Sequence, residues 1–333
     1  MFKFNKLTSI FKDAKLQEAF EVDGFVIVDF YTDEELAEVR SLYKRLHENK
    51  GPGFFPSTYS ADKNYRETID LELKRIGQRR FNELLEDYQV INGCYIVKQP
   101  GEDSYLHIHQ DMTLVDEREF VGINIWTTTI DLTDSNGVLY ALPGSHRFYP
   151  TYRGHTIPGF YDPIQEEIKD YMVPFYLKAG QALIFDQSII HFSPPNLSDE
   201  IRIVTNVFIT QKNARFLTCY HEKDNPEFIN KVELFEQELG FMTKSEQFGK
   251  DIYGRPTMGK SLGLVDYNFP CLTIEQLENQ FGKKRLRNHT PTKKTVAPIN
   301  VDADAIIDSK KSFWEVYTPI NILREIKYRL TGN

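Results

Sequence analysis

The chain has little cysteine and no long apolar run. Its 333 residues include three cysteines, Cys94, Cys219 and Cys271. Their odd number and wide spacing argue against a disulfide framework and indicate free thiols in a reducing compartment. No stretch approaches the roughly 18 apolar residues of a membrane-spanning helix, and the N-terminal residues lack the apolar segment of a secretory signal. We therefore expect a cytoplasmic protein without a membrane partner.

Positive charge is in deficit as well. The 40 lysines and arginines are outnumbered by 48 aspartates and glutamates, so the formal net charge is −8. An acidic surface repels phosphate groups, and we expect no nucleic-acid partner. Aromatic residues are plentiful, with 24 Phe and 18 Tyr in a chain that is 41% hydrophobic. This composition is typical of a soluble enzyme with an aromatic-rich β core.

The most informative motif is His109-Gln110-Asp111, which is followed far downstream by His191. Side chains alternate faces along a strand, so His109 and Asp111 point the same way. Residues 180–192 read as a turn and a buried strand that ends at two prolines, and this strand can return His191 to the same place. Two imidazoles and one carboxylate hold redox-active iron and leave coordination positions open. We interpret these three residues as metal ligands and as the catalytic centre of an oxygenase.

A buried arginine accompanies this motif. Arg202 opens a β-branched run over residues 201–209, which predicts a strand inside a sheet. A guanidinium in such a place favours a carboxylate partner, which its forked donors bind at two points. A dicarboxylate cosubstrate such as 2-oxoglutarate would chelate iron through its keto-acid end and meet Arg202 with its distal carboxylate.

In these segments the chain resembles the phytanoyl-CoA dioxygenase family of iron- and 2-oxoglutarate-dependent oxygenases. The resemblance runs from about Phe20 to Ile209. It rests on the His-Gln-Asp motif, on residues 135–139 leading to Pro-Gly-Ser-His at 143–146, and on residues 191–202. It implies Fe(II), 2-oxoglutarate and O2 as cofactors, and a cosubstrate carboxylate held by Ser193 and Arg202.

The resemblance also implies a reaction. A dioxygenase of this kind hydroxylates an unactivated C–H bond of a small molecule, here an amino-acid-like compound or a biosynthetic intermediate, and releases succinate and CO2. Two alternatives stay open. The same metal site can serve desaturation, cyclisation or epimerisation, and the chain can be a non-catalytic jelly-roll protein, because the same ligands suit zinc.

The expected fold is mostly β with flanking helices, in the α+β class. Its core is a double-stranded β-helix, the cupin-like jelly roll, over residues 90–209. We expect one oxygenase domain over 1–212 with helical N-terminal support. Residues 213–333 are expected to form a helical extension packed on that domain, with an exposed linker at about 282–298.

Periodicity and turn signals give the individual elements. The expected strands include 24–30 and 90–98, the expected helices are 32–49, 67–87, 226–239 and 313–330, and the expected long loop is 54–66.

Several further residues are candidates for the site. Residues 122–132 alternate, which predicts that Asn124 and Trp126 line the cavity and contact the cosubstrate. His107 is interpreted as a buried core histidine rather than a fourth ligand, and His146 as part of a structural turn. Lys98 is either a partner for a carboxylate or a residue on a strand edge.

Overall fold

The computed structural model describes residues 9–46, 53–148 and 151–282. The helix expected at 313–330 and nearly all of the linker expected at 282–298 lie outside these residues. Within the described ranges, no helix combines the length and the apolar character that crossing a membrane requires.

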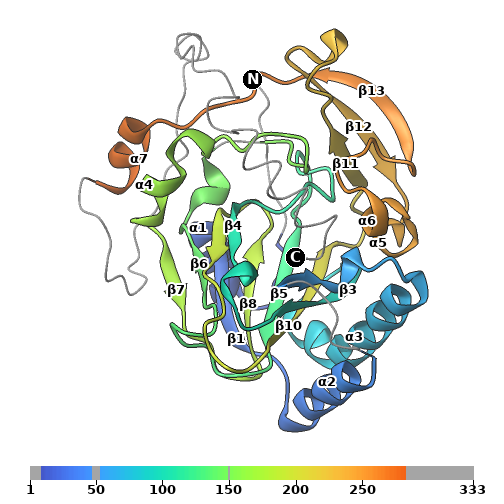
Figure 1. Cartoon of the computed structure of the whole chain (residues 1–333), viewed down its shortest axis with the longest axis vertical. Helices are drawn as coiled ribbons and strands as arrows, with labels where there is room; N and C mark the ends of the chain where they lie inside the picture. Colours follow the sequence, from blue (N-terminus) through green and yellow to red (C-terminus); the bar gives the residue numbers. More distant parts are fainter. Residues whose placement is uncertain (1–8, 47–52, 149–150, 283–333) are drawn as a thin grey trace.

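Two antiparallel sheets face each other at the centre of the molecule (Figure 1). The six-stranded sheet has the order β1-β8-β5-β10-β3-β2, and the four-stranded sheet has the order β4-β9-β6-β7. Between β3 and β10 the chain passes back and forth between the sheets, which confirms the jelly roll. The bounds of these core strands are β3 Tyr88–Lys98, β4 Leu106–His109, β5 Ile123–Thr128, β6 Leu139–Ala141, β7 Val173–Phe175, β8 Gln181–Asp186, β9 His191–Ser193 and β10 Arg202–Gln211.

The N-terminal elements support the larger sheet, as expected. Strand β1 (Phe25–Asp29) pairs with β8 and extends that sheet. Helix α2 (Asp33–Leu46) begins at a capping box in which Thr32 and Glu35 exchange side-chain and backbone hydrogen bonds of 3.2 and 2.9 Å. Helices α1 (Ala14–Asp23), α2 and α3 (Lys63–Leu84) contribute to one apolar cluster with residues of the larger sheet.

The prediction of a long loop at 54–66 is wrong. Residues Phe54–Pro56 form β2, which pairs with the end of β3 at the sheet edge. A 3-10 turn, η1 (Ser57–Tyr59), follows, and Asp62 caps α3 by accepting a hydrogen bond from the Tyr65 backbone. Pro56 concealed the strand in the sequence, because proline is tolerated in a sheet only on an edge such as this one.

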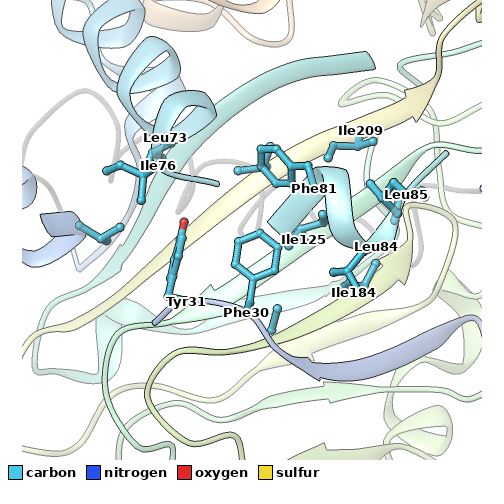
Figure 2. Packing of buried hydrophobic residues seen from close by; sticks show 14 of the residues in the cluster. Phe30, Tyr31, Leu73, Ile76, Phe81, Leu84, Leu85, Ile125, Ile184 and Ile209 are labelled. Atoms are coloured by element: carbon cyan, nitrogen blue, oxygen red, sulfur yellow. The ribbon is translucent and has the colours of Figure 1, made fainter. Parts of the chain in front are cut away.

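The core has two main layers. Outside the larger sheet, Leu73, Ile76 and Phe81 of α3 pack against strand residues such as Ile125 and Ile184 (Figure 2). A Cβ on Gly93 of β3 would lie 3.1 Å from Leu73 Cβ, so the glycine allows close approach of the helix. Between the two sheets, a second cluster includes Trp126, Phe185 and Val204. The His109-Gln110-Asp111 motif therefore lies in a densely packed barrel.

The region after the jelly roll is less helical than expected. Strands β11 (Phe216–Tyr220), β12 (Lys231–Gln237) and β13 (Lys260–Asp266) form a three-stranded sheet beside the barrel (Figure 1). The helix predicted at 226–239 is wrong, because only the 3-10 turn η5 (Pro226–Phe228) precedes β12. Asn230 has a φ of 53°, which ends any helix there, and a bulge after Leu234 disturbs the strand's alternation.

Short helices and turns complete the described chain. They are η2 Glu102–Ser104, η3 Ser145–Arg147, η4 Asp162–Ile164, α4 Gln165–Lys169, α5 Phe241–Lys244, α6 Gln247–Lys250 and α7 Ile274–Phe281.

Replacing Leu73 by alanine tests the role of α3. Leu73 is fully buried, so Leu73→Ala should lower the free energy of unfolding by about 2–5 kcal/mol through lost burial and a residual cavity. Leu71 of the same helix is 67% exposed, and Leu71→Ala should change stability by no more than about 0.5 kcal/mol. Urea denaturation of the metal-free proteins measures both. Equal effects would contradict the packing of α3 on the sheet.

Candidate metal centre and carboxylate-binding site

The pairing of β4 with β9 brings the expected ligands together. His109 lies directly opposite His191, and their ring centroids are 4.1 Å apart. Asp111 follows the end of β4, where its backbone N–H donates to the Gln187 carbonyl at 3.0 Å. Among the described residues these three form the one group of His, Cys, Asp or Glu side chains arranged to hold a metal ion.

The distances within this group suit a single ion. His109 Nε2 lies 3.7 Å from Asp111 Oδ1, and His191 Nε2 lies 4.0 Å from Asp111 Oδ2. Two donor atoms that each sit about 2.1 Å from a shared ion are at most about 4.2 Å apart. Both distances meet this limit, and one ligand atom from each of the three side chains lies within 4.8 Å of the others, which is a spacing that suits one ion.

Backbone carbonyls orient the two imidazoles. His109 Nδ1 lies 2.8 Å from the His107 carbonyl, and His191 Nδ1 lies 3.0 Å from the Ile189 carbonyl. A carbonyl only accepts, so each Nδ1 carries the proton and donates. Each Nε2 therefore presents its lone pair to the centre, as metal binding requires.

The charge states also suit a cation. Burial, together with the neighbouring His109, lowers the pKa of His191 to about 4, so this imidazole is neutral at pH 7. Burial opposes ionisation of Asp111, but the two imidazoles and the Asn124 amide together hold the pKa of the carboxyl below its usual value. A neutral His191 imidazole and an ionised Asp111 carboxylate result.

Asn124 lies where β5 faces this centre. Its amide nitrogen donates to Asp111 Oδ2, and its own carbonyl oxygen is 3.5 Å from Gln187 Nε2. Sequence alternation predicted that Asn124 faces the cavity, and in the structure its contact is with the candidate ligand Asp111. A hydrogen-bonded neighbour of this kind fixes the orientation of a ligating carboxylate.

Arg202 is a buried cation that has no acidic partner in the part of the chain that the structure describes. The residue is 1% exposed, and its guanidinium carbon lies 5.3 Å from the centre of the Trp126 ring. Nη1 donates to the Gly137 carbonyl at 2.8 Å, whereas Nε has no hydrogen-bond partner. Burial lowers the pKa of Arg202 to about 9, and the group still carries its proton at neutral pH.

Lys98 and Ser193 border Arg202. Lys98 lies opposite Arg202 across the β3–β10 ladder and is fully buried, so it is no exposed edge residue. Its ammonium nitrogen contacts the carbonyls of Ser193 at 2.9 Å and Pro194 at 2.5 Å. Ser193 is also fully buried, and its hydroxyl has no partner. Among the described residues no carboxylate forms an ion pair with Arg202 or Lys98, so the two basic side chains are suited to an anionic ligand.

Two other histidines near the motif lie apart from the metal group. The expectation that His107 is buried is wrong: its side chain is exposed and meets Tyr105 edge-on, with ring centroids 4.9 Å apart. A β-bulge between Leu106 and His109 breaks the alternation that had placed His107 beside His109. His146 contacts the Glu21 carbonyl at 3.2 Å within the turn η3, as expected.

Comparison with solved structures finds partial likenesses at low sequence identity. EvdO2 of Micromonospora carbonacea var. aurantiaca, complexed with 2-oxoglutarate, is 23% identical, with a TM-score of 0.46 over 60% of this chain and 91% of that chain. The epimerase SnoN from nogalamycin biosynthesis is 16% identical, with a TM-score of 0.43 over 61% of this chain and 84% of that chain.

Curated relatives are more similar in sequence. Phytanoyl-CoA dioxygenase domain-containing protein 1 of Danio rerio is 31% identical over 130 residues, which cover 37% of this chain and 45% of that protein. Phytanoyl-CoA dioxygenase of Arabidopsis thaliana is 32% identical over 142 residues, which cover 41% and 48%. The chain therefore matches about half the length of these relatives.

The family comparison covers the larger part of the chain. The model for phytanoyl-CoA dioxygenase (PhyH) matches residues 20–204, a range that contains the two histidines, the aspartate and the arginine described above. With this match, and with the jelly roll and the metal-binding geometry in place, the chain belongs to the phytanoyl-CoA dioxygenase (PhyH) family.

Proposed function

We propose that this protein is an Fe(II)- and 2-oxoglutarate-dependent dioxygenase that hydroxylates a small molecule. The observation that carries the proposal is the buried guanidinium of Arg202, which has no acidic partner among the described residues and shares the barrel with a His-Asp-His group. A buried charge is costly unless it is paired. A ligand carboxylate supplies the missing partner.

His109, Asp111 and His191 would hold the iron. Their three donors occupy one side of an ion and leave positions for a cosubstrate and for O2. With iron, 2-oxoglutarate and O2 bound, the site would supply the chemistry in which one oxygen atom of O2 enters a C–H bond and the other oxidises 2-oxoglutarate to succinate and CO2. The protein holds the ligands, orients the substrate and keeps bulk water out.

Three side chains would bind the distal carboxylate of 2-oxoglutarate. Arg202 offers the unpartnered Nε, Ser193 offers an unpartnered hydroxyl, and Lys98 beside them adds an amine that becomes a cation when the carboxylate binds. The Trp126 ring holds the guanidinium in place from one face. Zinc binding alone does not require buried basic side chains such as Arg202 and Lys98. Their presence therefore favours the enzyme over the non-catalytic alternative.

Hydroxylation is the proposed outcome because it needs the fewest protein groups. Epimerisation requires a group that returns hydrogen to the opposite face of the carbon, and desaturation requires loss of a second hydrogen. Hydroxylation requires only the metal site, the cosubstrate and a positioned C–H bond.

A cavity beside the motif supports an uncharged binding surface for part of the substrate. Met112, which directly follows Asp111, lines it together with His155 and residues of the C-terminal sheet and short helices. No aspartate, glutamate, lysine or arginine contributes to the lining. Most lining residues lie beyond residue 204, where the family match ends. We propose that this C-terminal part of the chain selects the substrate.

Removing a ligand tests the metal site. His191→Ala should abolish binding of Fe(II) under anaerobic conditions, because no neighbouring side chain can supply the lost bond. His107→Ala, an exposed histidine on the same strand as His109, serves as the control and should bind Fe(II) like the wild type. Metal content after dialysis measures both. Stoichiometric iron in the His191 variant would remove that residue from the site.

Replacing Arg202 by methionine should have opposite effects on 2-oxoglutarate binding and on the stability of the fold. The substitution removes a buried unpaired charge, so the metal-free variant should gain about 1 kcal/mol or more in unfolding free energy. Binding of 2-oxoglutarate should weaken by about 2–5 kcal/mol, because the carboxylate loses its charged partner. Calorimetric titration of the Mn(II)-loaded protein and thermal unfolding measure the two effects. Unchanged 2-oxoglutarate affinity would contradict the proposed subsite.

Lys98 should couple 2-oxoglutarate binding to pH. Burial and the nearby Arg202 lower the pKa of Lys98 to about 5, so the amine is neutral at pH 7 before the ligand binds. The arriving carboxylate raises this pKa, so binding takes up a proton and affinity increases as pH falls from about 8 toward 5. Titrations in two buffers of different ionisation enthalpy measure the uptake. Lys98→Met should abolish it, and a wild type without uptake would refute the coupling.

A further inference from the structure

Arg153 is another buried arginine, and its surroundings differ from those of Arg202. Its Nη1 and Nη2 donate to the two carboxylate oxygens of Glu117 at 2.8 and 2.5 Å, and both side chains are nearly inaccessible to solvent. Its Nε donates to the backbone carbonyl of Asp111 at 2.7 Å. Arg153 therefore joins a neutralised ion pair to the main chain of a candidate metal ligand.

The backbone of Arg153 is hydrogen-bonded to the segment that contains Asp111. The Arg153 N–H donates to the Thr113 hydroxyl at 3.0 Å, and the Thr113 N–H donates to the Arg153 carbonyl at 3.0 Å. On its amino side, Asp111 is held by the hydrogen bond from its N–H to the Gln187 carbonyl. Both peptide groups of Asp111 are thus fixed by contacts from other parts of the chain.

The C-terminal sheet braces the segment that follows Asp111. The Leu217 N–H donates to the Leu114 carbonyl at 3.0 Å, and the Asp116 N–H donates to the Arg215 carbonyl at 2.9 Å. A Cβ at Gly154 would lie 2.9 Å from the Cys219 carbonyl oxygen, so only a glycine permits this close contact with β11. Residues 111–117 are held between β11 and Arg153.

We propose that Arg153, neutralised by Glu117, is a positioning residue that sets the place of the Asp111 carboxylate in the metal site. Only an arginine serves here, because its rigid fork binds Glu117 with two nitrogens while Nε reaches the Asp111 carbonyl. Lysine has one nitrogen and cannot make both contacts in this geometry. The inference rests on the proposed function, since it takes Asp111 as a metal ligand.

The test compares Co(II) binding by Arg153→Lys and by the wild type. The variant should bind Co(II) 10–100-fold more weakly, and the visible spectrum of the bound ion should change because one ligand is misplaced. Arg66→Lys is the matched control. Arg66 is 3% exposed and donates to the carbonyls of Thr243 and Ser245, away from the metal group. It should lose stability while it binds Co(II) with wild-type affinity and spectrum.

Glu117→Gln is a second variant, to be used if Arg153→Lys does not fold, because glutamine has nearly the same shape as glutamate. It should weaken Co(II) binding and alter the spectrum in the same direction, because the fork loses its charged partner. All titrations are made at a temperature where circular dichroism shows folded protein. If a folded Arg153 or Glu117 variant has wild-type Co(II) affinity and spectrum, the role of Arg153 is overturned and the metal site still stands. A wild-type protein that binds no Co(II) would overturn the metal site itself and the inference with it.

Discussion

The antiparallel pairing of β4 with β9 is the constraint on which the candidate site depends. It sets His109 opposite His191 although the two residues are far apart in sequence. The bulge in β4 turns His107 outward and leaves His109 facing the centre. A shift of this register by one residue would turn a ligand away from the cavity. Ile108 of β4 and Phe192 of β9 belong to one apolar cluster, and the packing of this cluster helps to keep the register.

The buried charges of the barrel fall into two kinds. Arg153 has a carboxylate partner within the chain, so its charge stabilises a fixed arrangement of backbone. Arg202 has no such partner among the described residues, and the cost of burying its charge is offset only when an anion enters. The neighbouring Lys98 avoids this cost by staying neutral until an anion arrives. Arg153 therefore stabilises the structure of the site, whereas Arg202 is available to bind a ligand. The unpartnered charge of Arg202 is the physical reason for proposing a carboxylate cosubstrate.

Much of this arrangement could be predicted from the sequence, because its signals are local. Strand alternation predicted that His109 and Asp111 point the same way, and the two side chains do meet, although Asp111 lies just beyond β4. Residues 180–192 were expected to be a turn and one strand, whereas the structure divides them into β8 and β9 in different sheets. The capping box at Thr32 marked the start of α2. Asn124 and Trp126 were expected on the inner face of β5, where the structure has them.

Other features depend on contacts that a single sequence does not reveal. The apolar spacing of residues 226–239 fits a helix as well as a bulged strand, and only the neighbouring strands β11 and β13 decide between them. The exposure of His107 follows from a bulge with no local signal. The bond from Arg153 to Asp111 joins two loop positions through a side chain, which no periodicity encodes.

A crystal structure of the anaerobic protein with Fe(II) and 2-oxoglutarate tests the central claim most directly. We predict that the distal carboxylate lies about 2.7–3.2 Å from Arg202 Nε and from the Ser193 hydroxyl, with iron bound by His109, Asp111 and His191. A structure in which 2-oxoglutarate binds elsewhere, with Arg202 still unpaired in the barrel, would contradict the account.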